Sequence, residues 1–262
     1  TYSLLSNGAQ DPSGNIAASV STDFTYVVPA SAGPRDVVIN ELMADPSPPV
    51  GLPDAEYVEL YNANLSDSYD LAGWTFSDGS TTATLPAFTL LPGAHCIVVD
   101  DATASLFSTY PNVVVVGTFP SMNNDGDPLT LKDNNGNLID AVTYALSWYQ
   151  DAAKADGGWS LEQIDPTTPC SSAANWRASN AATGGSPSGQ NSVFAIVPDT
   201  QAPSWINIPV NENEECDGSG NLIGLNAWLS SFTAGDVCGN AVVTHSFVQM
   251  VEACGVTGSM VY

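Results

Sequence analysis

Carboxylates are the side chains through which this 262-residue sequence could most easily do chemistry, because 28 Asp and Glu stand against 4 Lys and Arg. Two facing carboxylates can cleave a glycosidic bond, one as the acid and the other as base or nucleophile. Glu41 and Glu59 are the candidates, since we expect their strand-like segments to be neighbours. No H-E-x-x-H, G-x-S-x-G or phosphate-loop motif accompanies them in the sequence.

A histidine and a cysteine stand side by side at His95 and Cys96. Consecutive residues of a strand point to opposite faces, so these two cannot easily act as a thiolate–imidazole pair. We predict that His95 is an exposed strand residue. His245 has no cysteine beside it, and we expect a core or surface role for it.

Three aspartates form a candidate calcium site. Asp125, Asp127 and Asp133 fall within nine residues, and Ca²⁺ binds hard oxygen ligands at such spacing. The segment lacks the ligand order and the terminal Glu of an EF-hand. The alternative is a hairpin turn in "DNNGN", because Asn-Gly favours positive φ at a turn centre.

Two further aspartates, Asp199 and Asp236, lie like Asp11 beside expected module junctions. A bound calcium ion would stiffen such a joint. The alternative is that these are solvated loop carboxylates.

Five cysteines without any C-x-x-C pair disfavour a structural zinc site and favour an oxidising compartment. The odd count suggests that Cys254 has its partner beyond Tyr262. The other four, expected to form disulfides, are Cys96, Cys170, Cys216 and Cys238.

The net charge of −24 excludes classes of partner. Nucleic acids and anionic membranes would repel such a surface. No apolar run reaches the length of about 18 residues that a membrane span needs, so we predict no membrane insertion. Carboxylates without basic partners need salt or divalent cations, which suits an extracellular or cell-surface location.

The pattern along the chain predicts an all-β fold of tandem immunoglobulin-like β-sandwich modules with little helix. Short Val/Ile/Leu/Thr runs alternate with Asn/Asp/Gly turn clusters at sandwich spacing. One short helix is expected at 101–110. In 56–62, alternation places Tyr57, Glu59 and Tyr61 on one face of a half-buried strand. Linkers at 29–34 and 197–203 divide the chain into modules at 1–30, 36–195 and 199–262, the third incomplete.

The segment "GGWSLEQIDPTTPCSSAANW" (157–176) fits neither a helix nor an alternating strand. Irregular backbone cannot be buried unpaired, so it needs anchors and polar partners. We expect Trp159 and Trp176 to be the anchors and Glu162 to accept hydrogen bonds from backbone amides. Trp148 and Tyr149 form the most plausible exposed aromatic pair for a ligand contact, such as a glycan.

Residues 36–192 resemble the lamin-tail domain family in its bacterial secreted form. The matching pieces include "VVINELMADP", "EYVELYN", "DLAGWTFSD", "NNDGDPLTLKDNNGNLIDAVTY" and "GGWSLEQID". The resemblance implies an immunoglobulin-like β-sandwich without catalytic activity at Glu41 or Glu59. The family's usual Arg is replaced by Gln163, which removes one possible ion pair with a neighbouring carboxylate. Within this sandwich a disulfide between Cys96 and Cys170 is expected.

The flanking parts resemble other modules. Residues 1–28 look like the last strands of a bacterial immunoglobulin-like module, with a "D-x-x-G-N" turn at 11–15, and residues 198–262 resemble a repeat similar to the HYR family. Such repeats are common in large surface proteins of Bacteroidetes. We therefore expect a non-catalytic stalk, fibre or adhesin segment whose partners are neighbouring modules of the same or an adjacent chain. The alternatives are a module that binds a glycan or a surface protein, and a carrier region for an enzyme elsewhere in the chain.

Overall fold

The computed structural model describes residues 2–24, 26–168, 172–198, 202–210, 222–236, 241–245, 249–250 and 260–261. The chain forms two compact units. The first comprises Thr1–Pro166 and Trp176–Ala195, and the second comprises Thr167–Asn175 and Ile196–Tyr262. The described parts are mostly strands, so the prediction of an all-β fold with little helix is confirmed.

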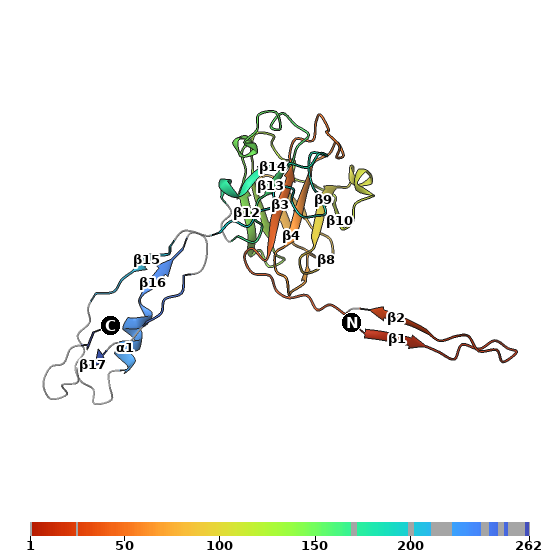
Figure 1. Cartoon of the computed structure of the whole chain (residues 1–262), viewed down its shortest axis with the longest axis horizontal. Helices are drawn as coiled ribbons and strands as arrows, with labels where there is room; N and C mark the ends of the chain where they lie inside the picture. The colour runs from red at the N-terminus through yellow and green to blue at the C-terminus, as the bar shows by residue number, and fades with distance from the viewer. Residues whose placement is uncertain are drawn as a thin grey trace. The chain divides into compact units, whose positions relative to one another are not determined.

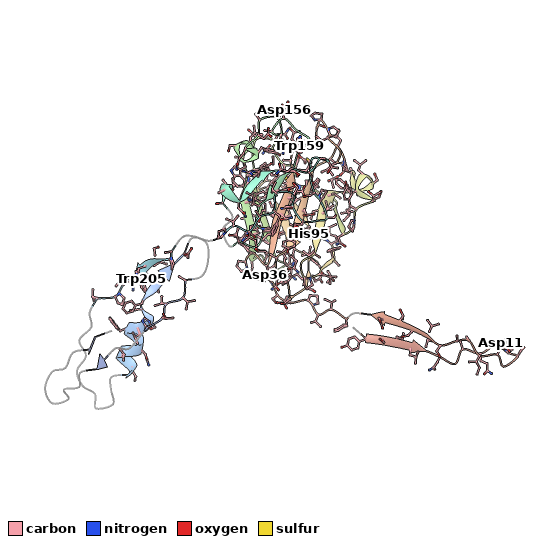
Figure 2. All side chains as sticks on the ribbon, viewed as in Figure 1. Asp11, Asp36, His95, Asp156, Trp159 and Trp205 are labelled. Carbon is pink, nitrogen blue, oxygen red and sulfur yellow. The ribbon has the colours of Figure 1, made fainter. Side chains whose placement is uncertain are left out.

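The first unit begins with a two-stranded hairpin formed by β1 (Tyr2–Ser6) and β2 (Val20–Phe24). Figure 2 shows Asp11 at the tip of this hairpin, far along the ribbon from the paired strands. Every described side chain of β1 is exposed, including Leu4 and Leu5.

A six-stranded sheet, in the order β10-β9-β4-β3-β13-β14, forms one layer of a sandwich. The pairs are antiparallel except for β9 and β10. Strands β3, β4, β9 and β10 run side by side in Figure 1 in the order that the pairing gives. Their bounds are β3 Val37–Met43, β4 Tyr57–Asn62, β9 His95–Asp100, β10 Val113–Val116, β13 Leu161–Gln163 and β14 Trp176–Ala178.

The second layer is a four-stranded sheet in the order β12-β11-β6-β7. A two-stranded ribbon (β5 with β8) and two 3₁₀ turns (η1 and η2) complete this unit. The bounds are β5 Tyr69–Asp70, β6 Thr75–Ser77, β7 Thr82–Thr84, β8 Thr89–Leu90, η1 Ala104–Phe107, β11 Pro128–Lys132, β12 Leu138–Thr143 and η2 Leu146–Tyr149. The helix expected at 101–110 is therefore present only as the short turn η1.

The main hydrophobic core contains inward-facing side chains of both sheets, such as Val58, Leu60, Phe76 and Leu131, all fully buried. Because strand side chains alternate, Tyr57 and Glu59 point to the other face of β4. That face is buried too, since Tyr57 packs in a second apolar cluster with Phe107 of η1. The prediction of a half-buried β4 is therefore wrong, because loops cover the outer face of the sheet.

One polar link joins the two sheets. Asp140 of β12 accepts hydrogen bonds from the backbone N–H of Ile39 on β3 (2.8 Å) and from Arg35 (2.9 Å). Burial raises the pKa of Asp140, although the Arg35 charge opposes this shift. The link satisfies a buried carboxylate at the sheet interface.

The second unit contains short strands, one 3₁₀ turn and one α-helix among its described residues. The segment 226–232, expected to belong to a β module, lies largely in helix α1. Its Leu, Ala and Asn residues lack the β-branched side chains that favour strands. The bounds are η3 Ala173–Asn175, β15 Ser204–Asn207, α1 Leu222–Ser230, β16 Thr233–Gly235, β17 Gln249–Met250 and β18 Met260–Val261.

Candidate functional site

Three glutamates from three adjacent strands form a row on the outer face of the six-stranded sheet. Glu59 of β4 is the register partner of Glu41 on β3, and Glu41 is the partner of Glu162 on β13. A β-bulge in β3 lies between Ile39 and Glu41. All three glutamates are fully buried, which is rare for side chains that carry a charge. We call Glu41, Glu59 and Glu162 the glutamate row.

A polar loop covers the glutamate row. Residues 184–193, "GGSPSGQNSV", run over its carboxylates, and we call this segment the strap. A Cβ on Gly185 would lie 2.6 Å from Oε1 of Glu41, so only glycine allows the strap to approach this closely. Asn191 fastens the strap by donating to the backbone carbonyls of Asn40 (3.2 Å) and Gln163 (2.8 Å).

Glu41, in the middle of the row, accepts three hydrogen bonds on one oxygen. Its Oε1 accepts from the hydroxyls of Tyr57 and Ser160, both at 2.6 Å, and from the backbone N–H of Ser186 at 2.9 Å. Its Oε2 is buried and has no hydrogen-bond partner among the described residues. Burial, followed by the charge of Glu162, raises the pKa of Glu41 to about 7.

Glu59 bonds to both the sheet and the strap. Its Oε1 accepts from the side-chain amide of Asn40 at 2.8 Å, and its Oε2 accepts from the backbone N–H of Ser188. Burial, followed by the charge of Glu41, raises the pKa of Glu59 well above its usual value. The two neighbouring carboxyl groups therefore disfavour each other's ionisation.

Glu162 holds the two ends of the strap. Its Oε1 accepts from the Ser186 hydroxyl at 2.8 Å. Its Oε2 accepts from the Ser192 hydroxyl at 2.7 Å and from the backbone N–H of Val193 at 3.1 Å. The expectation that Glu162 accepts from backbone amides is confirmed for one amide, and hydroxyls supply its other two bonds.

The chemistry open to the glutamate row follows from these contacts. The structure brings Glu41 and Glu59 together as the sequence predicted, but their oxygens bond to the strap, and neither side chain reaches solvent. Buried irregular backbone needs hydrogen-bond partners, and the row supplies acceptors for three strap amides. The arrangement therefore serves to dock a loop onto a sheet.

Gln163, which stands where the resemblance implies an Arg, lies next to the row on β13. Its side-chain amide donates to the backbone carbonyl of Ile39 at 2.7 Å. Its Oε1 is buried without a hydrogen-bond partner among the described residues.

The two tryptophans expected as anchors pack as predicted. Trp176 is fully buried in the main core, and Trp159 packs against the same core while half-buried. Nζ of Lys154 lies 4.6 Å from the centroid of the Trp159 ring. Figure 2 places Trp159 near one end of the sandwich and Asp36 near the other.

The structure describes four of the five aspartates proposed for calcium. Among the described residues, no three His, Cys, Asp or Glu side chains form a group that could hold a metal ion. Asp125 is exposed, Asp127 accepts from Asn123 (2.9 Å), and Asp236 is half-buried after β16. Asp199 lies outside the described residues. Calcium binding stays a prediction.

Asp133 instead closes a hairpin turn between β11 and β12. Its carboxylate accepts from the backbone N–H groups of Asn135 (2.9 Å) and Asn137 (2.8 Å) and from the Asn137 side chain. Desolvation tends to raise the pKa of Asp133, but the bonds from Asn137 and Asn135 outweigh it, so the pKa lies below its usual value. The hairpin-turn alternative for this segment therefore agrees with the structure.

Cys96 is a fully buried free thiol on β9. Burial raises the pKa of this thiol far above its usual value. The expected disulfide between Cys96 and Cys170 is therefore not formed in the structure, because the Cys96 thiol is free. Cys170, Cys216, Cys238 and Cys254 lie outside the described residues, so any disulfides among them stay predictions.

Each of the two histidines lies beside an aromatic ring. His95 is half-buried, not exposed as predicted, because its ring lies 4.5 Å from that of Tyr61. Burial lowers its pKa to about 4. His245 is exposed, and its ring lies 5.3 Å from that of Phe232.

The aromatic pair proposed as a ligand contact is less accessible than predicted. Tyr149 is buried, and Trp148 is half-buried because its ring packs 6.1 Å from that of Trp176. The expected exposure is therefore wrong for Tyr149. The same turn borders a shallow hollow of about 270 Å³ lined by Leu146, Ser147, Gln150, Asp151, Ala152 and Ala155.

The comparison with protein families agrees with the sandwich. Residues 30–145 match the family model of the Lamin Tail Domain. This family has an immunoglobulin-like β-sandwich fold, so the lamin-tail prediction is supported for this segment and the predicted fold class is confirmed. The lamin-tail match indicates a non-catalytic structural module. Strands β13 and β14 lie beyond the matched residues and complete the six-stranded sheet.

No curated protein matches the chain. None of the helices in the described ranges combines the length and the apolar character that crossing a bilayer requires.

Proposed function

We propose that this chain is a non-catalytic structural segment of a large extracellular protein, a stalk, fibre or adhesin of the kind found on the surface of Bacteroidetes. In this proposal the lamin-tail sandwich is the central module, residues 1–30 end an immunoglobulin-like module, and residues 199–262 belong to an HYR-like repeat. Its partners are neighbouring modules of the same or an adjacent chain.

The glutamate row carries this proposal. The three buried glutamates lie under the strap, and Glu41, Glu59 and Glu162 all accept hydrogen bonds from it. An enzyme needs its carboxylates within reach of a substrate. Here they stabilise a loop, which supports a rigid module as the function.

The surface charge supports the proposed location. A net charge of −24 keeps a protein soluble in a salty exterior and repels nucleic acid. Calcium, held by Asp125, Asp127, Asp133, Asp199 or Asp236, would screen part of this charge in the proposed protein. Binding to the native state alone must raise the unfolding temperature, so a thermal melt at increasing millimolar calcium tests that part.

The location is tested on intact cells of the source organism. An antibody raised against residues 36–195 is expected to label cells without permeabilisation, and treatment of the cells with protease is expected to remove the signal. Labelling that requires permeabilisation would contradict the proposed surface location.

A second candidate function is glycan or protein binding at the hollow beside η2. The observation that favours it is the concave shape lined by Leu146 and Ala155, with the Trp159 ring and Lys154 in the same region of the chain. A glycan array with the Leu146→Glu variant tests it, because Leu146 is 42% exposed and its replacement leaves the core intact. Binding that Leu146→Glu abolishes supports this function, whereas silence across the array leaves the structural function.

A further inference from the structure

The strap depends on the glutamate row for its docking. Backbone N–H groups of Ser186, Ser188 and Val193 each donate to a different glutamate of the row. The strap itself carries no titratable side chain. Of the strap and the row, only the glutamates of the row can therefore change charge with pH.

Few charged or titratable groups of neighbouring elements face the row. On β4, the Tyr57 hydroxyl donates to Glu41. The Cys96 thiol of β9 lies in the main core on the inner face, although the charge of Glu59 contributes to its raised pKa. Burial, followed by the charge of Glu41, raises the pKa of Tyr110, which follows η1. Arg177 of β14 is the register partner of Glu162, and its guanidinium donates to Gln150 at 3.4 Å.

Full ionisation would place three like charges in one buried layer. Each buried charge already loses hydration, and adjacent carboxylates repel each other more strongly in a medium of low dielectric constant than in water. A proton on the row relieves both penalties. The row therefore needs an oxygen atom that can bind a proton without loss of a hydrogen bond to the strap.

Glu41 has such an oxygen atom. The hydrogen bonds that Tyr57, Ser160 and Ser186 make to Glu41 all converge on its Oε1. Its Oε2 is buried and accepts nothing from the described residues. A proton on Oε2 removes the charge of Glu41 and leaves all three bonds in place.

We propose that the strap is a proton-dependent latch, closed while Oε2 of Glu41 keeps a proton and released when Glu41 ionises. The strap, rather than the whole sandwich, opens because polar contacts hold it, whereas the inner faces of β3 and β4 bury apolar side chains. Segments with few apolar contacts open at the lowest free-energy cost.

The direction of the pH dependence follows from linkage. The pKa of Glu41 is raised to about 7 in the closed state, above the 4.5 of an unperturbed Glu, by burial and then by the charge of Glu162. The closed state therefore binds more protons than the open state. Its stabilisation is complete at low pH and is lost as the pH rises through about 7.

Hydrogen exchange of the full chain tests the latch. Peptides covering 184–193 and 37–62 are followed by mass spectrometry between pH 5.5 and pH 9, with rates corrected for the intrinsic effect of pH. We expect strap protection to fall by about tenfold or more, the change that one pKa unit of linkage produces. Protection of 37–62 is expected to stay constant.

Two variants separate the row from other titrating groups. Glu41→Gln keeps the Oε1 acceptor and cannot ionise, so it should keep the strap protected at pH 9. Glu56→Gln is the matched control, because burial raises the pKa of Glu56 to about 7 as well, while its carboxylate bonds to Ser121 outside the strap. Glu56→Gln should lose strap protection as the wild type does.

Three results would overturn the latch: strap protection in the wild type that does not change with pH, a Glu41→Gln variant that opens like the wild type, or opening prevented by Glu56→Gln. If circular dichroism shows that Glu41→Gln does not fold at pH 6, the wild-type pH series and Glu56→Gln carry the test. The wild-type pH series decides independently of both variants.

Discussion

In the central strands of the six-stranded sheet both faces are buried, but the two faces are built from opposite chemistry. Leu60 and Val58 face the inner core, while their neighbour Glu59 faces the strap, and all three are fully buried. The inner face needs only apolar side chains of fitting shape. The outer face lies under irregular backbone and therefore needs acceptors for amides. Burial alone thus says little about which residue type a strand position requires.

The inner face should show the largest mutational effect. Leu60→Ala removes a fully buried side chain from the main core and is expected to lower the free energy of unfolding by about 2–5 kcal/mol. Denaturant titration measures this. Leu138→Ala, at a position 51% exposed, is the control and should change stability by less than about 0.5 kcal/mol. Equal losses of unfolding free energy in the two variants would contradict the assignment of Leu60 to the main core.

The outer face should show a smaller loss that depends on chemistry more than on volume. Glu41→Ala removes the acceptor of the Tyr57 and Ser160 hydroxyls and of the Ser186 amide, and one of these groups left unpaired costs about 1–3 kcal/mol. Glu41→Gln keeps that acceptor and should lose less. If both variants lose equally at pH 6, the shared Oε1 acceptor is not what stabilises this face.

The close approach of the strap gives a third difference between the faces. A Cβ at position 185 would lie 2.6 Å from Oε1 of Glu41 and 2.8 Å from the Tyr57 hydroxyl. Gly185→Ala should therefore increase proteolytic cleavage of the strap and leave the inner core unchanged by near-UV circular dichroism. Gly117→Ala is the matched glycine control, because φ is not positive there and the nearest atom to the added Cβ is Oδ2 of Asp101 at 4.0 Å. Unchanged cleavage in Gly185→Ala would contradict the tight docking.

The smallest effect is expected outside both faces, at the Asp133 turn. Asp133→Ala removes the acceptor for Asn135 and Asn137 and should lower the unfolding temperature slightly. The pKa of Asp133 lies below its usual value, so its contribution is present at neutral pH and is lost on acidification through that pKa. Melting curves of both forms at pH 7 and pH 3 measure this. They should converge at the lower pH, and a constant gap would contradict the turn's dependence on the carboxylate.

The sequence predicts those turns and strand faces that depend only on neighbouring residues. The same Asp-x-x-Gly-Asn pattern forms the same hydrogen bonds at Asp11 with Asn15 and at Asp133 with Asn137, on two different hairpins. Alternation in β4 likewise separates Leu60 from Glu59. Such features need no knowledge of distant residues.

The covered outer face could not be predicted in this way. Glu41 and Ser186 are 145 residues apart in sequence, and nothing in the strand around Glu41 shows that a loop will cover it. A signal was present, because Glu41 and Glu162 each interrupt an apolar run in "VVINELMA" and "WSLEQI". This pattern showed that the two carboxylates occupy unusual positions, but it did not show which groups form hydrogen bonds to them.

The most direct test of the docking account is amide hydrogen exchange of the full chain by NMR at pH 5.5. The account predicts that the Ser186, Ser188 and Val193 amides are strongly protected, because they donate hydrogen bonds to buried carboxylates. The Leu60 amide of β4 is the internal reference and should be protected at least as strongly. Exchange of the three strap amides at the rate of an unstructured loop would contradict the claim that the glutamate row holds the strap.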